Sequence, residues 1–125
     1  MEKFKALGLN EEILTSIEKK GFTEPSPVQA EVVPVLLDST QDVIVMAQTG
    51  TGKTAAFGLP ICQNLSATGV VKALVICPTR ELAVQVCNEM ASFVNDKRFK
   101  ILPVYGGQPF REQKRELQKG VDVVV

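Results

Sequence analysis

Four short apolar runs alternate along the chain with longer stretches that carry helical spacing or helix-capping signals. A nearly continuous apolar run is typical of a parallel strand that is buried on both faces. The runs occupy residues 42–46, 70–77, 101–105 and 121–125. Strands that alternate with helices in this way predict an α/β fold, in which a parallel β-sheet carries helices on both faces.

Capping residues and prolines delimit the helices that this fold requires. Asn10 is suited to cap the first helix, because its side chain can accept a bond from a free backbone N–H. Ser26 and Gln29 have the spacing of a capping box, in which each side chain bonds the backbone N–H of the other residue. Pro34 and Pro60 fall inside helical stretches and predict a kink or an early end. The predicted helices span residues 11–20, 28–37, 53–65, 79–94 and 110–119.

Composition narrows the classes of protein that remain. The 125 residues fit one domain, and a hydrophobic content of 45% can supply a core. The formal net charge is zero, so any nucleic acid must be bound by local groups rather than by a global field. The absence of histidine excludes Ser-His and Cys-His catalysis. Cys62, Cys77 and Cys87 lack metal-ligand spacing and are expected to be free thiols in a reducing compartment.

Targeting signals are not evident in the sequence. No apolar run approaches the roughly 20 residues of a membrane span, and the first residues lack the apolar stretch of a secretory leader. We therefore expect a soluble, cytoplasmic protein with no membrane partner.

A glycine-rich loop separates the run at residues 42–46 from the following helix. Strand, glycine loop and helix are the context of a phosphate-binding loop, in which backbone N–H groups surround an anion at the helix N-terminus. Gly50 and Gly52 can adopt positive φ there and let the main chain approach phosphate oxygens. Lys53 would contact the β- and γ-phosphates, and the Thr54 hydroxyl would bind Mg²⁺. The candidate phosphate-binding residues are Ala47, Gln48, Thr49, Gly50, Thr51, Gly52, Lys53 and Thr54.

This loop departs from the usual pattern at its first position, where Ala47 stands in place of glycine. The alternative interpretation is an ordinary Gly/Thr turn in which Lys53 is merely solvated. The spacing and the flanking elements favour triphosphate binding, although they specify neither the base nor the use of the energy.

Two further segments follow the carboxyl ends of predicted strands, where open α/β sheets bind their ligands. Pro78, Thr79 and Arg80 bring a hydroxyl, a guanidinium and free backbone N–H groups to a helix start. On local grounds alone, the favoured interpretation is that Thr79 simply caps the helix and that Arg80 is solvated. Gly106 and Gly107 mark either a sharp turn or a close approach of another backbone, and alone they favour the turn.

Taken together, these segments resemble the front part of the first RecA-like domain of a DEAD-box RNA helicase, a P-loop NTPase. Residues 21–29 resemble the Q motif of that family, and Phe4 matches its isolated upstream aromatic residue. Residues 47–54 match motif I, in which alanine replaces the leading glycine, and residues 78–83 match motif Ia. Gly106 and Gly107 match the GG element. We expect residues 1–125 to form a partial RecA-like domain, with the Q-motif region at 1–40 and an incomplete P-loop core at 41–125.

The resemblance implies a role for each matched residue. Gln29 would read the adenine edge through its amide, and Phe22 would stack on the base. Residues 47–54 would hold the phosphates of ATP, with Lys53 as the catalytic residue and Thr54 on Mg²⁺. Single-stranded or locally duplex RNA would be held by its backbone, largely independently of sequence. The residues implied in that grip are Pro78, Thr79, Arg80, Gly106 and Gly107.

Other elements of the family do not occur in this sequence. There is no Asp-Glu-Ala-Asp, and the triplet Ser66-Ala67-Thr68 lies in a predicted loop ahead of motif Ia rather than after an acidic motif, so we expect a domain truncated before the acidic motif. Such a chain would neither hydrolyse ATP efficiently nor unwind RNA, because phosphoryl transfer depends on those electrostatic groups. It would also leave apolar sheet edges unpaired and prone to self-association. The alternatives are a non-catalytic adenine-nucleotide or RNA-binding module, and a P-loop kinase acting on a small metabolite.

Overall fold

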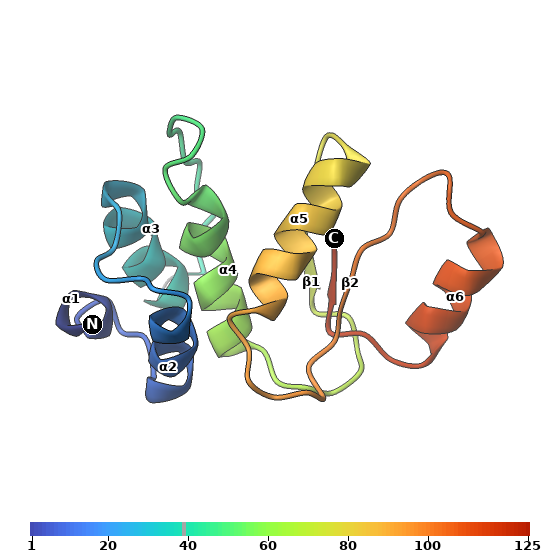
Figure 1. The fold of residues 1–125 in the computed structure, drawn as a ribbon, viewed down its shortest axis with the longest axis horizontal. Helices are drawn as coiled ribbons and strands as arrows, with labels where there is room; N and C mark the ends of the chain where they lie inside the picture. Colours follow the sequence, from blue (N-terminus) through green and yellow to red (C-terminus); the bar gives the residue numbers. More distant parts are fainter. Residues whose placement is uncertain (39) are drawn as a thin grey trace. The chain divides into compact units, whose positions relative to one another are not determined.

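The computed structural model describes residues 1–38 and 40–125, which divide into two compact units (Figure 1). The first unit comprises Met1–Asn64 and the second Leu65–Val125. No helix within the described ranges is both long enough and apolar enough to cross a membrane.

Helices make up the regular structure described in the first unit. They are α1 (Glu2–Lys5), α2 (Glu11–Lys19), α3 (Pro27–Asp38) and α4 (Lys53–Asn64). The Asn10 side chain accepts a hydrogen bond from the Ile13 N–H and so caps α2 as predicted. α3 packs along α4, and the core between the helices is built from fully buried apolar side chains. These include Phe4, Ile17, Val33 and Leu59.

The predicted strand at residues 42–46 is not a strand in this structure. A strand needs a neighbouring backbone to share its N–H and C=O groups, and the described part of the first unit contains no strand. The segment instead has no regular secondary structure and is exposed, with Ile44 at 93% and Met46 at 92% relative exposure.

The second unit contains a parallel sheet with helices in its connections. Its elements are β1 (Ala73–Leu74), α5 (Arg80–Ala91), β2 (Ile101–Leu102), α6 (Phe110–Gln118) and β3 (Val123–Val124). β3 lies between β1 and β2, and Val123 is opposite both Ala73 and Ile101. α5 packs against β2 and buries Val86 and Met90. The parallel sheet and its connecting helices agree with the predicted fold class.

A buried carboxylate joins the starts of these strands. Asp122 is fully buried, and its Oδ1 accepts hydrogen bonds from the N–H groups of Thr68 (2.8 Å) and Gly69 (2.9 Å). Its Oδ2 accepts the Lys100 N–H at 2.8 Å. Burial by itself raises the pKa of this carboxyl, but the three N–H donors and the charge of Lys72 outweigh it and hold the pKa below its ordinary value.

The predicted helices are all present, with ends shifted by up to three residues. α3 continues past Pro34 to Asp38, and α4 continues past Pro60 to Asn64, so neither proline gives the early end that was one of the two predicted effects, and both helices run about as far as the predicted bounds. The strands predicted at residues 70–77, 101–105 and 121–125 are present with shorter paired segments. Ladder bonds nevertheless extend further, since the Val75 N–H bonds the Val124 carbonyl and the Val104 N–H bonds the Val125 carbonyl.

Candidate functional site

The glycine loop in the first unit has features that favour a bound anion. Gly50 and Gly52 have φ of 79° and 87°, in the region where a Cβ is disfavoured. Lys53 is the first residue of α4, so the loop opens directly onto a helix N-terminus. The backbone of Gln48, Thr49 and Gly50 belongs to exposed residues. These features fit an anionic ligand.

The Lys53 ammonium group binds a backbone carbonyl at the start of the glycine loop. Its Nζ donates to the Ala47 carbonyl at 2.6 Å, and the Thr51 hydroxyl donates to the Gln48 carbonyl at 2.7 Å. A phosphate oxygen would replace a neutral acceptor of Lys53 with a charged one, which makes a stronger hydrogen bond. Thr54 occupies the first turn of α4 and is half-buried.

Gln29 connects the capping box to the glycine loop. Its Oε1 accepts the Ser26 N–H at 3.0 Å, while its backbone N–H donates to Ser26 Oγ at 3.4 Å. The predicted cap is therefore formed. The other end of the same amide, Nε2, donates to the Gly52 carbonyl at 3.2 Å, and the residue is only 5% exposed. Two segments far apart in sequence meet at one side chain.

Phe22 takes part in an aromatic pair at the start of this region. Its ring stacks on Phe4, with centroids 6.2 Å apart and planes inclined by 27°. The Lys20 ammonium lies 5.9 Å from the Phe22 centroid. Phe4 is fully buried, whereas Phe22 is half-buried. Phe4 thus supports the position of Phe22 from within the core.

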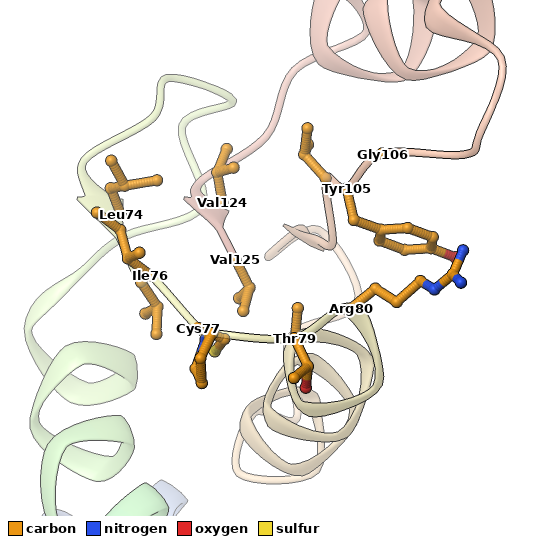
Figure 2. Close-up of a pocket in the computed structure, with 13 residues that line it drawn as sticks. Leu74, Ile76, Cys77, Thr79, Arg80, Tyr105, Gly106, Val124 and Val125 are labelled. Atoms are coloured by element: carbon orange, nitrogen blue, oxygen red, sulfur yellow. The ribbon is translucent and has the colours of Figure 1, made fainter.

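The second unit carries a cavity of about 500 Å³ at the carboxyl ends of its strands (Figure 2). One side is apolar, and its labelled side chains come from the strands and their extensions: Leu74, Ile76, Val124 and Val125. Thr79, Arg80 and Tyr105 supply polar groups on the other side. The cavity therefore combines an apolar wall with a cationic rim.

Thr79 and Arg80 show the local interactions that the sequence left open. Thr79 Oγ1 accepts the Leu82 N–H at 3.1 Å and caps α5, so its own hydroxyl hydrogen can still be donated to a ligand. Arg80 is 61% exposed and lies 3.4 Å from Glu81. A Cβ added to Gly107 would lie 3.1 Å from Arg80 Nη1. Both predicted RNA-contacting segments of this unit thus meet at one place.

Gln113 was missed in the sequence reasoning, although it holds the neighbouring loop. Its Oε1 accepts the Tyr105 N–H at 2.9 Å, and its Nε2 donates to the Tyr105 carbonyl at 3.1 Å. The only sequence signal is an amide side chain in the first turns of the helix that follows the two glycines. Charged helix surfaces contain many such residues, so that signal has little specificity.

A family model described as DEAD/DEAH box helicase matches residues 26–125. The chain belongs to the DEAD/DEAH box helicase family. Membership in this helicase family sets aside the small-metabolite kinase as an alternative. The match covers the capping-box glutamine, the glycine loop and the cavity of the second unit.

Named helicases are similar over the whole of this chain. It is 48% identical over 126 residues to the DEAD-box ATP-dependent RNA helicase CshA of Geobacillus kaustophilus, covering 100% of this chain and 27% of that protein. It is 47% identical over 122 residues to RhpA of Helicobacter pylori, covering 98% of this chain and 25% of that protein. The chain therefore spans about a quarter of the length of these curated relatives.

Solved structures of helicases share its fold. A DEAD box protein from Methanococcus jannaschii superposes with a TM-score of 0.93 at 36% identity, covering 98% of this chain and 34% of that one. The RNA helicase Prp28 from Chaetomium thermophilum, solved with ADP, gives a TM-score of 0.84 at 33% identity. That match covers 100% of this chain and 32% of the other.

Proposed function

We propose that this chain binds ATP with Mg²⁺ and contacts RNA as the front part of an ATP-dependent RNA helicase. The observation that carries the proposal is the hydrogen bond from the Gln29 amide to the Gly52 carbonyl, next to Lys53 in sequence. An adenine-reading residue and a phosphate-binding loop have to approach one nucleotide from two sides. Gln29 and Gly52 are 23 residues apart and yet in direct contact.

The base would be recognised by Gln29 and Phe22. Each amide end of Gln29 has one partner in the structure, but a carbonyl oxygen has two lone pairs and an NH₂ group has two hydrogens. The remaining lone pair and hydrogen are a complementary pair for the adenine edge. Phe22, supported by Phe4, would stack on the base.

The phosphates would be held by residues 47–54. Backbone N–H groups around Gly50 and Gly52, with the N-terminus of α4, fit an anion in this position. Lys53 would exchange the Ala47 carbonyl for phosphate oxygens, and Thr54 would hold Mg²⁺ through its hydroxyl. The metal ion would supply neutralisation of the charge on the phosphates.

RNA would be contacted in the second unit by its sugar-phosphate backbone. Arg80 offers a largely exposed guanidinium, and Thr79 retains a hydroxyl hydrogen. Pro78 leads into the same helix start, and Gly106 and Gly107 present exposed backbone beside it. Contacts of this kind position a strand without reading its sequence.

We further infer that the 125 residues alone neither hydrolyse ATP efficiently nor unwind RNA. The reason is the missing Asp-Glu-Ala-Asp element, whose carboxylates the reaction requires for its metal ion and attacking water. A non-catalytic binding module remains the competing proposal. RNA-stimulated phosphate release by the full-length protein would distinguish a helicase from such a module.

Base selectivity gives the sharpest test of the proposed nucleotide site. Calorimetric titration should show ATP and ADP binding tightly and GTP and GDP much more weakly. Gln29→Ala should remove most of this preference, roughly tenfold or more, since an unpaired polar edge in a built site costs about 1–3 kcal/mol.

Gln63→Ala is the matched control for this experiment. Gln63 also joins backbone groups across the first unit, accepting the Asn10 N–H and donating to the Gly8 carbonyl, but it lies at the far end of α4 from Lys53. Its loss should lower stability without changing base preference. Equal binding of guanine and adenine nucleotides by the unaltered chain would refute the adenine-reading role.

A further inference from the structure

One side-chain amide binds the backbone at the start of the loop that follows β2. Gln113 in α6 bonds both the N–H and the C=O of Tyr105, at 2.9 Å and 3.1 Å. A second bond joins the same loop, because Gln108 Nε2 donates to the Tyr105 hydroxyl at 3.0 Å. Side-chain hydrogen bonds therefore hold both Tyr105, which directly precedes residues 106–109, and Gln108 within them.

Gln113 binds the first residue beyond the ladder of hydrogen bonds between β2 and β3. The Val104 N–H still bonds the Val125 carbonyl across the sheet. Tyr105 is the next residue, and the Gln113 amide takes the place of a neighbouring peptide group for it. Since a primary amide has the donor and acceptor of a peptide unit, it can end the strand without leaving either backbone group unpaired.

The position of this loop is coupled to Arg80. Gly107 has a φ of 86° and leaves room for the guanidinium, because a Cβ there would lie 3.1 Å from Nη1. Figure 2 shows the Arg80 side chain extending toward the Tyr105 ring at the rim of the cavity. A shift of Tyr105 would therefore change the surroundings of the Arg80 guanidinium.

We propose that Gln113 is a positioning residue for RNA binding, which acts by fixing Tyr105 and thereby the Gly106–Gly107 backbone beside Arg80. This inference rests on the proposed RNA contact of Arg80 and the two glycines. Gln113 itself need not touch RNA. Gln113 keeps the backbone groups and the guanidinium in one arrangement before RNA binds, which reduces the entropy lost on binding.

The test compares two substitutions of Gln113 with the same substitutions of Gln118 in the full-length protein. Gln118 lies on the same helix and is exposed, so it controls for composition and charge. Gln113→Met keeps the length of the side chain and removes both bonds to Tyr105. Gln113→Glu keeps an acceptor for the Tyr105 N–H but places a second oxygen against the Tyr105 carbonyl.

We expect both Gln113 variants to bind a fluorescent single-stranded oligouridylate about tenfold more weakly than their Gln118 counterparts, because Gln113→Met loses both bonds to Tyr105 and Gln113→Glu replaces one of them with repulsion between two oxygens. The affinity for ATP and the KM for ATP should stay unchanged. Hydrogen exchange at Tyr105 and Gly106 should accelerate. A general loss of folding would instead move the ATP parameters and the melting temperature together.

Arg80→Ala separates failure of this inference from failure of the RNA site. If Arg80→Ala weakens RNA binding while Gln113 and Gln118 variants bind alike, the positioning role is wrong and the RNA site stands. If Arg80→Ala also has no effect, the proposed RNA contact fails, and the role of Gln113 fails with it. If one Gln113 variant does not fold, the other still decides between these outcomes.

Discussion

Gly50 and Gly52 illustrate how two residues with the same backbone conformation can have different environments. Both have positive φ. A Cβ at Gly50 would meet nothing within 4 Å, whereas a Cβ at Gly52 would overlap Gln29 Nε2 and lie 3.3 Å from Ser26 Oγ. Gly52 is therefore constrained both by its own φ and by the amide that bonds its carbonyl.

This difference predicts unequal effects of alanine at the two positions. Gly50→Ala should cost about 1–2 kcal/mol of unfolding free energy through backbone strain alone. Gly52→Ala should cost more, because it also displaces the Gln29 amide. Thermal denaturation of both variants measures the difference.

A double-mutant cycle checks the cause. In a Gln29→Ala background, the extra cost of Gly52→Ala should largely disappear, while the cost of Gly50→Ala should not change. If Gly52→Ala lowers the unfolding free energy equally in both backgrounds, Gln29 does not contribute to the cost of a Cβ at this position.

At the residue scale, the sequence predicted interactions that are local and missed those that are not. The Ser26–Gln29 cap and the Thr79 cap depend on residues three positions apart, and both are formed. The resemblance to helicases placed Gln29 and residues 47–54 on the same nucleotide, but it did not indicate the bond from Gln29 to Gly52. Asp122 lies inside an apolar run and bonds residues 22 and more positions away, so no local pattern indicated its role.

At the scale of elements, the helices follow from the sequence more closely than the strands. A helix satisfies its own backbone, so caps and spacing suffice to predict α2 to α6. A strand depends on a partner, and residues 42–46 lack one in the described part of the first unit despite an apolar pattern. In the second unit, the strand starts converge on Asp122, which bonds segments before β1 and before β2.

Asp122 should make the second unit sensitive to acid. Its pKa is lowered on folding, so its charge stabilises the folded state fully above the unfolded pKa of about 4, and this contribution is lost as pH falls through the folded pKa. Asp122→Asn should lower the unfolding free energy at pH 7 by about 1–3 kcal/mol, because an amide NH₂ would face a backbone N–H. It should also flatten the decline of stability below pH 4. Denaturant titrations between pH 3 and 7 measure both effects.

Asp96→Asn provides the control. The Arg98 side chain lowers the pKa of Asp96 as well, but Asp96 is only partly buried and pairs with its neighbour in solvent. Its replacement should have little effect at pH 7. A pH profile of Asp122→Asn that follows the unaltered chain would contradict the stabilising role of the carboxylate.

At the scale of the whole molecule, each unit exposes a segment with large apolar side chains. In the first unit, residues 43–46 border a groove of about 450 Å³ that is also lined by Val32 and Val35. In the second unit, β1 is an edge strand with Leu74 exposed, and Ile76 beyond it is 84% exposed. Unpaired apolar edges of this kind can pair with another copy of the chain.

We expect the 125-residue chain to self-associate in a concentration-dependent manner. Sedimentation velocity should show species larger than the monomer, and Ile44→Asp or Ile76→Asp should shift the distribution toward the monomer. Phe110→Asp is the control, because Phe110 is also apolar and exposed but belongs to a helix. A monomer at every concentration would show that these segments are protected in solution.

The strand order β1-β3-β2 also has a consequence for synthesis on the ribosome. Among the three described strands the central one is made last, so β1 and β2 emerge before the backbone that joins them. Residues of the first unit, whose described contacts are helical, can assemble while the second is still being translated. The nascent chain thus passes through a stage in which the N-terminal helices are packed while β1 and β2 are still unpaired. We expect a chaperone to bind the nascent chain at this stage.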